Sequence, residues 1–534
     1  MDHPVKEARR APLPALAALL FIAAIVLAAF GGLLAAAPRG GMGAAAPGDP
    51  WLWHVTRFTL WQAALSTVLS LLFALPVARA LARQARFPGR GLFIRLMSLP
   101  LALPQLVAVL GLLSVWGANG WLAHLARAAG APSGPDIYGL CGILLAHVFF
   151  NMPLAVRLLT ARLERLPGEY WRLAAQLGMP PSAIWRLVEW PALRAALPGA
   201  AALIFMLCAT SFTVVLTLGG GPAATTLEVA IYEALRFDFD PARAVLLAFL
   251  QVALTAALFV LLRRLAAPLE ASAHLERPAP RPDAAAGRRA DGLWLIAAAA
   301  FTAAPLAGII TAGLKADLAR LLSEPALHRA LATSLIIAAA AAALSLALGW
   351  ALLRALEGPR GGIGSGPVAR AADMAASLVL VVPPLVIAAG WFVILYPGGH
   401  LEALAPAVVI IINALMALPF VWRILRPAFI ESRQRYGPLC AQLGMRGAAR
   451  LRLVDWPLLR RPAGLALALA AALSIGDLGA IALFGSQDFR TLPWLLYSRM
   501  GSYRTADASG LALVLLLFIL ALMAAAERAG RARS

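Results

Sequence analysis

The residues that could carry chemistry in this chain are few, and they lie in strongly apolar sequence. Asp477 and His147 are the clearest ionisable groups there, and a charge inside an apolar span is costly enough to mark a candidate for function. Asn151, four residues after His147, would share its helix face and could hydrogen-bond to another helix. Gly476 and Gly479 flank Asp477, which could instead bond backbone N–H groups freed by a broken helix.

The sequence shows no signature of a metal or catalytic site. Its seven histidines lack an HExxH or similar spacing, and its three cysteines, Cys141, Cys208 and Cys440, include no CxxC pair. Lys6 and Lys315 are the only lysines, and neither stands in the Gly-Lys-Ser/Thr string of a P-loop. We therefore expect no catalytic residue, no metal and no cofactor bound by this chain.

The elements that position these residues are predicted to be membrane-spanning helices. The chain has 534 residues, of which 61% are hydrophobic and 13% charged, which excludes soluble enzymes and disordered chains. A helix needs about 20 apolar residues to cross a bilayer. Twelve stretches meet this length: 13–36, 58–81, 96–117, 137–160, 197–219, 242–262, 293–314, 329–353, 374–396, 404–425, 462–485 and 508–526. We predict an all-α integral membrane protein with twelve transmembrane helices.

The basic residues predict the orientation. The net charge is +20, from 46 basic and 26 acidic residues. With both termini cytoplasmic, most basic residues fall in cytoplasmic loops, as the positive-inside rule requires, and there they meet anionic lipid. Nucleic acid is not needed to explain the charge. A cleaved signal peptide is the alternative for 13–36, but such signals have only about 7–15 apolar residues.

An internal repeat is the main organisational feature. Ala-Ala-Gln-Leu-Gly-Met at 174–179 returns as Cys-Ala-Gln-Leu-Gly-Met at 440–445, and the repeat offset is 440 − 174 = 266. The same offset relates Glu-Trp-Pro at 189–191 to Asp-Trp-Pro at 455–457. Since the offset is close to half the chain length, we predict two tandem repeats of six helices.

The predicted boundaries follow from the repeat. The first repeat covers 1–263 and the second 293–534, joined by a cytoplasmic linker at 264–292 that is rich in Pro, Ala and Arg. Each repeat has an even number of spans, so both insert the same way up. The repeated motif then lies in two cytoplasmic loops, at 161–195 and 427–461.

The first loop is predicted to be a helix–turn–helix. Pro167 suits a helix start and Gly178 a left-handed helix end. Ser182 could cap a second short helix that Pro191 ends. Helices of this kind could lie on lipid, but duplication of the motif favours two docked partner proteins.

Small side chains offer those partners a docking surface. Ala174 with Gly178, and Ala441 with Gly444, would leave one side of each helix almost bare. The backbone of another protein could therefore approach closely.

Both loops resemble the EAA loop of permeases in binding-protein-dependent ABC importers. That pattern places a Pro thirteen residues after its Gly, and here 191 − 178 = 13 and 457 − 444 = 13. The resemblance implies the type I permease fold, with two coupling loops docked on two copies of an ATPase subunit that binds ATP-Mg. The implied coupling residues are Ala174, Ala175, Gly178, Pro191, Ala441, Gly444 and Pro457. Arg172 and Pro438 replace the Glu of the pattern, so no salt bridge is expected from that position.

Longer strings are similar to permeases of thiamine importers from Gram-negative bacteria. They include residues 143–153, 218–222, 238–244, 476–479, 489–493 and 501–504. The resemblance implies import of thiamine and its phosphates across the bacterial inner membrane by alternating access, with one periplasmic thiamine-binding protein as partner. Candidate pathway residues are Asp477, its repeat counterpart Ser211, Asn151 and His147. The Asp477 carboxylate could attract the positive thiazolium ring.

Three alternatives remain. Fused permeases for ferric iron share parts of the second-half pattern, so iron or another small solute could be the substrate. A proton-driven secondary transporter also has six plus six spans, but residues 82–90 are Arg-rich and lack the acidic–basic signature of that class. A membrane enzyme would need clustered acidic or His groups at the interface, which the sequence does not show.

Overall fold

The structure is a computed structural model that describes residues 13–36, 49–130, 137–265, 281–358, 363–364, 366–378, 381–445, 447–502 and 504–531. Its regular secondary structure in these ranges is helical, apart from one isolated bridge between Glu357 and Ile363. Eleven helical stretches are long and apolar enough to cross a membrane, and one further apolar helix, α17 (Pro384–Leu395), is shorter. An all-α protein with many membrane-spanning helices is therefore confirmed.

The chain divides into two compact units that differ from the two sequence halves. The first unit contains residues 41–324 and 496–516, and the second contains 1–40, 325–495 and 517–534. The first helix of the chain thus belongs to the second unit, and the first helix after the linker belongs to the first unit. Each sequence half contributes its leading helix to the unit built mainly from the other half.

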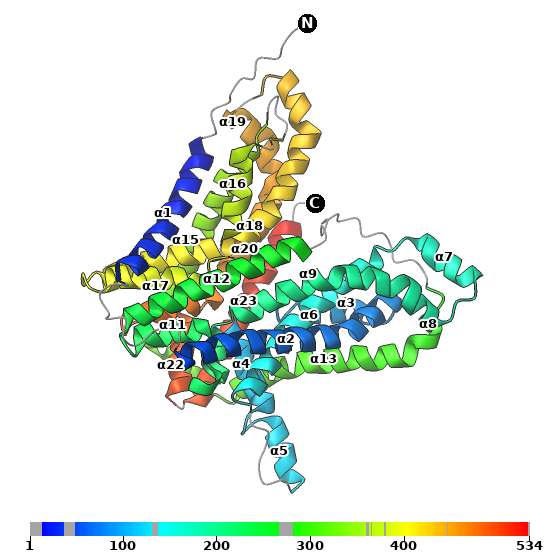
Figure 1. Cartoon of the computed structure of the whole chain (residues 1–534), viewed down its shortest axis with the longest axis horizontal. Coiled ribbons are helices and arrows are strands. Elements are labelled where there is room, and N and C mark those ends of the chain that lie inside the picture. The colour runs from blue at the N-terminus through cyan, green and yellow to red at the C-terminus, as the bar shows by residue number, and fades with distance from the viewer. Residues whose placement is uncertain are drawn as a thin grey trace. The chain divides into compact units, whose positions relative to one another are not determined.

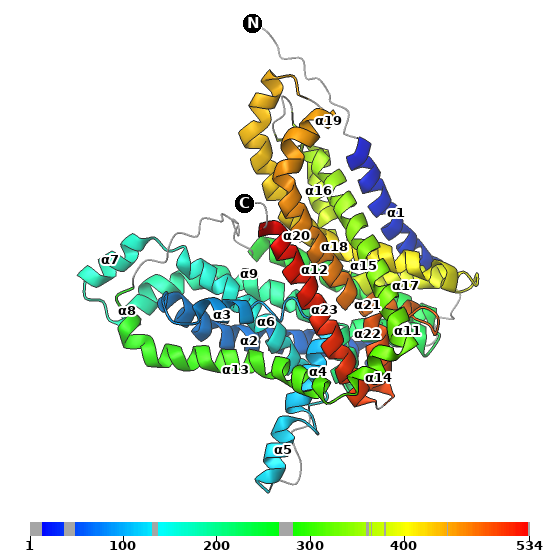
Figure 2. The same ribbon diagram turned by 180° about the vertical axis from the view of Figure 1, so that it is seen from behind.

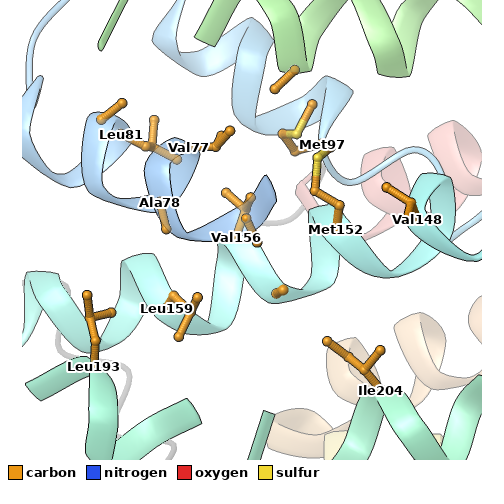
Figure 3. Close-up of a cluster of buried hydrophobic side chains, with 14 of the residues drawn as sticks. Val77, Ala78, Leu81, Met97, Val148, Met152, Val156, Leu159, Leu193 and Ile204 are labelled. Carbon is orange, nitrogen blue, oxygen red and sulfur yellow. The ribbon is translucent and has the colours of Figure 1, made fainter. Parts of the chain in front are cut away.

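The first unit is built around helices α2, α6, α9 and α13, which run side by side (Figures 1 and 2). Figure 3 shows part of its core, a cluster that includes Val77 and Leu81 of α2 and Val156 and Leu159 of α6. The elements of this unit are α2 (Pro50–Arg83), α3 (Arg90–Leu96), α4 (Gln105–Trp116), α5 (Trp121–Ala128), α6 (Leu140–Glu164), α7 (Gly168–Gln176), α8 (Pro181–Ile184), the π-helix η1 (Trp185–Glu189), α9 (Trp190–Ala209), α10 (Thr213–Leu218), the 3₁₀ turn η2 (Pro222–Ala224), α11 (Leu227–Arg236), α12 (Pro241–Leu265), α13 (Ala284–Leu314) and α14 (Leu318–Ser323).

The second unit is built around α15, α18 and α20, which pack against one another. Its elements are α1 (Leu13–Ala36), α15 (Pro325–Leu353), the 3₁₀ turn η3 (Arg354–Leu356), α16 (Pro367–Ala376), α17, α18 (Leu401–Gln442), α19 (Gly447–Arg450), the π-helix η6 (Leu451–Asp455), α20 (Trp456–Gly476) and α21 (Gly479–Phe484). Helices α22 (Leu492–Gly501) and α23 (Thr505–Arg531) each have residues in both units.

In the second unit, α1 packs closely on α17 through glycines. A Cβ atom at Gly390 would overlap the carbonyl oxygen of Ala29, and one at Gly32 would lie 2.9 Å from the carbonyl oxygen of Gly390. Residues without side chains let the two backbones touch, which is a common way for helices to associate in membranes.

The first unit repeats this contact between α13 and α4. A Cβ atom at Gly111 would lie 2.5 Å from the carbonyl oxygen of Pro305, and one at Gly308 would lie 3.1 Å from the carbonyl oxygen of Gly111. Each leading helix therefore meets the interrupted third span of its unit at a pair of glycines.

Helix α13 begins earlier than the sequence suggested. Residues 284–292, which we expected in the linker, are helical, whereas 266–280 lie outside the described residues. The alanines at 284–286 are good helix formers, and the charged Asp291 in the third turn is 5% exposed because it pairs with Arg83.

Two pairs of predicted spans are interrupted rather than continuous. The span expected at 197–219 breaks between α9 and α10, and that expected at 462–485 breaks between α20 and α21. The third span of each half is also divided. Pro104 and Pro383 stand directly before α4 and α17, and both proline and the residue before it are disfavoured inside a helix.

Candidate functional site

The first repeated loop forms the helix and turn that its sequence predicts. Helix α7 begins after Pro167, and Gly178 ends it with a left-handed φ of 57°. The Met179 N–H donates to the Ala174 carbonyl at 3.0 Å, and the Gly178 N–H to the Ala175 carbonyl at 3.1 Å. These two bonds form a Schellman-type helix end.

The second part of this loop differs from our prediction. Helix α8 begins at Pro181 with Pro180 as its cap, so Ser182 lies inside the helix and does not cap it. Pro191 does not end a helix either: it is the second residue of α9. The π-helix η1 absorbs the proline, because its wider turn lets the Trp190 N–H bond the Trp185 carbonyl and relieves the usual clash with the carbonyl four residues earlier.

The second loop repeats the turn and the π-helix but not the separate helix. Gly444 has φ 64°, the Met445 N–H donates to the Cys440 carbonyl at 2.9 Å, and the Trp456 N–H bonds the Leu451 carbonyl. The preceding helix, however, is continuous with α18, which runs for 42 residues. In the first loop, α6 and α7 are distinct helices.

The predicted small-residue docking face is wrong for Ala174. Its methyl group is 1% exposed and packs under the loop against Trp171 and Ile184. Its repeat counterpart, Cys440, is equally buried. Periodicity alone could not show which side of α7 faces inward.

The other predicted coupling residues are accessible to different degrees. Pro191 is half-buried, whereas the remainder are exposed: Ala175, Gly178, Ala441, Gly444 and Pro457.

Three exposed leucines on each loop were missed from the sequence. Leu173, Leu177 and Leu187 are 53%, 67% and 61% exposed. Their counterparts at the repeat offset, Leu439, Leu443 and Leu453, are 51%, 65% and 66% exposed. Exposed apolar side chains that recur on both loops indicate contact surfaces, and their identity in the two copies of the repeat was the available signal.

A buried polar cluster links three helices of the first unit. His147 and Asn151 on α6 are 3% and 5% exposed. The His147 Nδ1 lies 2.9 Å from the Ser66 Oγ of α2, and the Asn151 amide donates to the Cys208 Sγ of α9 at 3.3 Å. Gln62 of α2 donates to the Cys208 carbonyl at 2.9 Å. The predicted cross-helix hydrogen bonds are thus confirmed, and Gln62 and Ser66 join the set.

The second unit has a smaller version of this cluster. Asn413 is the repeat counterpart of His147, and its amide donates to the Ser474 Oγ at 2.9 Å. Ser474 is the counterpart of Cys208. The two units therefore differ in polarity at equivalent positions.

Asp477 and Ser211 occupy equivalent helix breaks. Asp477 lies between α20 and α21, where its carboxylate accepts hydrogen bonds from the N–H groups of Gly479 at 3.1 Å and Ala480 at 3.2 Å. Ser211 lies between α9 and α10 and is 5% exposed. The alternative interpretation of Asp477, as a hydrogen-bond acceptor for backbone N–H groups freed by the helix break, is confirmed. Asp477 belongs to the second unit, and Ser211, His147 and Asn151 belong to the first.

No group of three or more His, Cys, Asp or Glu side chains that could hold a metal ion occurs among the described residues. The buried polar groups above consist mainly of amides, hydroxyls and one imidazole. Such groups can orient a small solute by hydrogen bonding.

Known proteins resemble the chain over nearly its whole length, although no protein-family model matches it. It is 53% identical over 520 residues to the thiamine transport system permease protein ThiP of Brucella abortus (strain 2308), covering 97% of this chain and 95% of the relative. ThiP of Escherichia coli (strain K12) is 45% identical over 530 residues, covering 97% and 98%. The molybdenum transport system permease protein ModB of Mycobacterium bovis is 32% identical over 203 residues, covering 37% of this chain and 74% of the relative.

Proposed function

We propose, because the chain belongs to the family of thiamine transport system permeases, that it imports thiamine and thiamine phosphates from periplasm to cytoplasm. It acts as the membrane-spanning subunit of an ATP-binding-cassette importer. The near full-length similarity to named thiamine permeases carries this proposal. The alternative is that the chain is a fused permease whose substrate is ferric iron or another small solute.

The two repeated loops support an arrangement with two ATPase subunits. Each loop presents three leucines at matching positions next to a left-handed glycine turn. In this proposal, each set inserts into one copy of a cytoplasmic ATPase that binds ATP-Mg. The chain itself is a transport subunit and binds no cofactor.

A layout of six plus six helices is part of the same proposal. The matching glycine turns, π-helices and glycine contacts of the two units support two tandem repeats. The short α17 then counts as one of the twelve spans, the ninth along the chain. An even number of spans places both termini on the same side of the bacterial inner membrane, and the distribution of basic residues makes that side the cytoplasm.

We propose that the buried polar cluster of the first unit forms part of the substrate pathway. His147, Asn151 and Ser211 remain candidates, and Gln62 and Ser66 extend them. Asp477 is a weaker candidate than the sequence suggested, because two backbone N–H groups already occupy its carboxylate. One periplasmic thiamine-binding protein delivers the substrate.

Reconstituted uptake tests the proposed function. Labelled thiamine is offered to proteoliposomes that contain this chain, its ATPase and its binding protein, with thiamine pyrophosphate and ferric iron as competitors. We expect uptake that requires all three proteins and ATP, is reduced by thiamine pyrophosphate and is unaffected by iron. Competition by iron would reassign the substrate, and uptake without the ATPase would indicate a secondary transporter.

A further inference from the structure

A buried charge network lies beneath the first loop, where helix α9 begins. Glu189 of η1 is fully buried, and its carboxylate accepts hydrogen bonds from Arg79 Nε at 2.7 Å and Arg281 Nη2 at 2.5 Å. Arg79 belongs to the end of α2, whereas Arg281 lies in the last part of the predicted linker, directly before α13. One carboxylate therefore joins three segments that are distant in sequence.

Arg281 is held on several sides. Its side chain is 3% exposed, and its guanidinium makes a two-pronged contact with Asp283 at 3.0 and 3.1 Å. It also lies over the Trp171 ring of α7, 4.2 Å from the ring centroid. Burial disfavours the Arg281 cation, but Glu189 and Asp283 outweigh this effect and raise its pKa. The group thus stays charged while it contacts both η1 and α7.

The network continues into α13. Arg83, at the end of α2, lies 3.4 Å from Asp283 and 3.5 Å from Asp291. A Cβ atom at Gly287 would overlap the Arg83 guanidinium, so the bare backbone at Gly287 makes room for this arginine. Ion pairs therefore connect the start of α13 to α2 as well as to the first loop.

The second loop has an equivalent carboxylate with a different set of partners. Asp455, the counterpart of Glu189, is 1% exposed and lies 3.1 Å from Arg433 and 3.7 Å from Arg450. Arg433 also binds Glu357 at 2.8 Å. All these partners belong to the second half of the sequence. Of these two carboxylates, within the described ranges, only Glu189 pairs with a residue that follows residues 266–280 along the chain.

We propose that Arg281 is a positioning residue that latches the first coupling loop to α2 and α13. A buried charge pair is weak evidence for stability. An arginine that binds a carboxylate in two prongs and stacks on an aromatic ring, however, holds its partners in a fixed geometry. Movement of α7, imposed by a docked ATPase, is then passed through Trp171, Arg281 and Glu189 to α2 and α13. The inference rests on the proposed function.

Coupling efficiency is the first test. In the assembled transporter, thiamine imported per ATP hydrolysed is measured for Arg281→Ala, Arg281→Lys and the exposed control Arg289→Ala. We expect Arg281→Ala to lower this ratio by about fivefold or more while ATP hydrolysis continues. Arg281→Lys keeps the charge but not the planar fork, so its ratio should be intermediate. Arg289→Ala should match the unaltered protein.

Hydrogen–deuterium exchange is the second test and does not depend on transport. Arg281→Ala should make residues 168–189 exchange several-fold faster and leave residues 440–455 unchanged. Gly287→Ala displaces Arg83 and changes no residue of the loop itself. It should lower the transport ratio and speed the exchange of residues 168–189, each to a smaller extent than Arg281→Ala does. Asp455→Asn should affect residues 440–455 instead.

The outcomes separate the latch from the proposed function. An unaltered transport ratio and unaltered exchange in both Arg281→Ala and Gly287→Ala would overturn the latch. If Arg281→Ala does not fold, Arg281→Lys and Gly287→Ala decide in the same way. If the unaltered complex imports no thiamine, the proposed function fails, whereas faster exchange of 168–189 would still support the latch.

Discussion

Asp477 lies at the break between α20 and α21, where it accepts hydrogen bonds from the backbone. Its two carboxylate oxygens bond the N–H groups of Gly479 and Ala480, which are the free donors at the start of α21. The flanking glycines made this role predictable from the sequence. The substrate role depended on a resemblance, and the local hydrogen bonds now compete with it.

Two substitutions at Asp477 distinguish these roles. Asp477→Ala leaves two partly buried N–H groups without their acceptor, so we expect a loss of about 1–2 kcal/mol in the free energy of unfolding and a lower melting temperature. Asp477→Asn keeps one side-chain oxygen as acceptor and should retain most of that stability and thiamine uptake. Melting curves in detergent and uptake assays measure both. Asp477→Asn with normal melting but no uptake would instead support a substrate contact.

Residue types predicted some details of the loops and not others. Gly178 and Gly444 were predictable because few residues other than glycine adopt a positive φ. Ala174 was not, because the side of α7 that faces inward is set by Trp171 and Ile184, which the helical period alone does not reveal.

At the scale of elements, the two glycine contacts predict a sharp dependence on side-chain size. Gly390→Ala would drive a methyl group into the Ala29 carbonyl oxygen, so α1 and α17 must separate, at a cost of about 1–3 kcal/mol. Gly464 lies in α20 with no atom within 4 Å of a Cβ position. Gly464→Ala should be neutral or stabilising by up to about 1 kcal/mol. Melting temperatures compare the two, and equal values would refute close α1–α17 packing.

The exposed leucines predict where the loops bind their partners. Leu177→Asp with Leu443→Asp places a charge in each contact surface, and we expect binding to the ATPase to weaken by about 2 kcal/mol per loop, or roughly 30-fold. Leu177→Met with Leu443→Met keeps the apolar volume and should bind normally. Copurification and titration with the ATPase measure the effect. Normal binding by the aspartate variant would show that the loops dock through another surface.

Proline positions marked interruptions that the sequence prediction missed, because the spans at 96–117 and 374–396 were expected to be continuous. Pro104 and Pro383 stand before short helices, as their missing N–H groups require. Pro191 was expected to end a helix, yet the chain continues through a π-helix into α9. Glu189, the last residue of this π-helix, is bound by Arg79 and Arg281, and sequence periodicity reveals neither these contacts nor the π-type bonding.

At the scale of the whole molecule, the repeat predicted two similar halves but not the exchange of their leading helices. The repeat offset relates sequences, whereas the compact units are defined by contacts. Helices α1 and α13 have little amphipathic pattern, so nothing in their own residues identifies the helices on which they pack. The glycines at 32 and 308 show their partners only once the structure places Gly390 and Gly111 beside them.

The exchange predicts that neither half is stable without the other. When the chain is divided within residues 266–280, the first part lacks α13 and the second lacks α1, so each unit loses a helix that covers its interrupted third span. Expressed alone, either part should accumulate several-fold less than the intact chain, because an unfolded fraction is removed by proteases. Expressed together, the two parts should copurify and restore uptake, since the Arg281–Glu189 contact and both glycine contacts need no covalent linker. Membrane yields, gel filtration and uptake measure this. A single half that accumulates normally and melts cooperatively at the temperature of the intact chain would show that the leading helices are dispensable for folding.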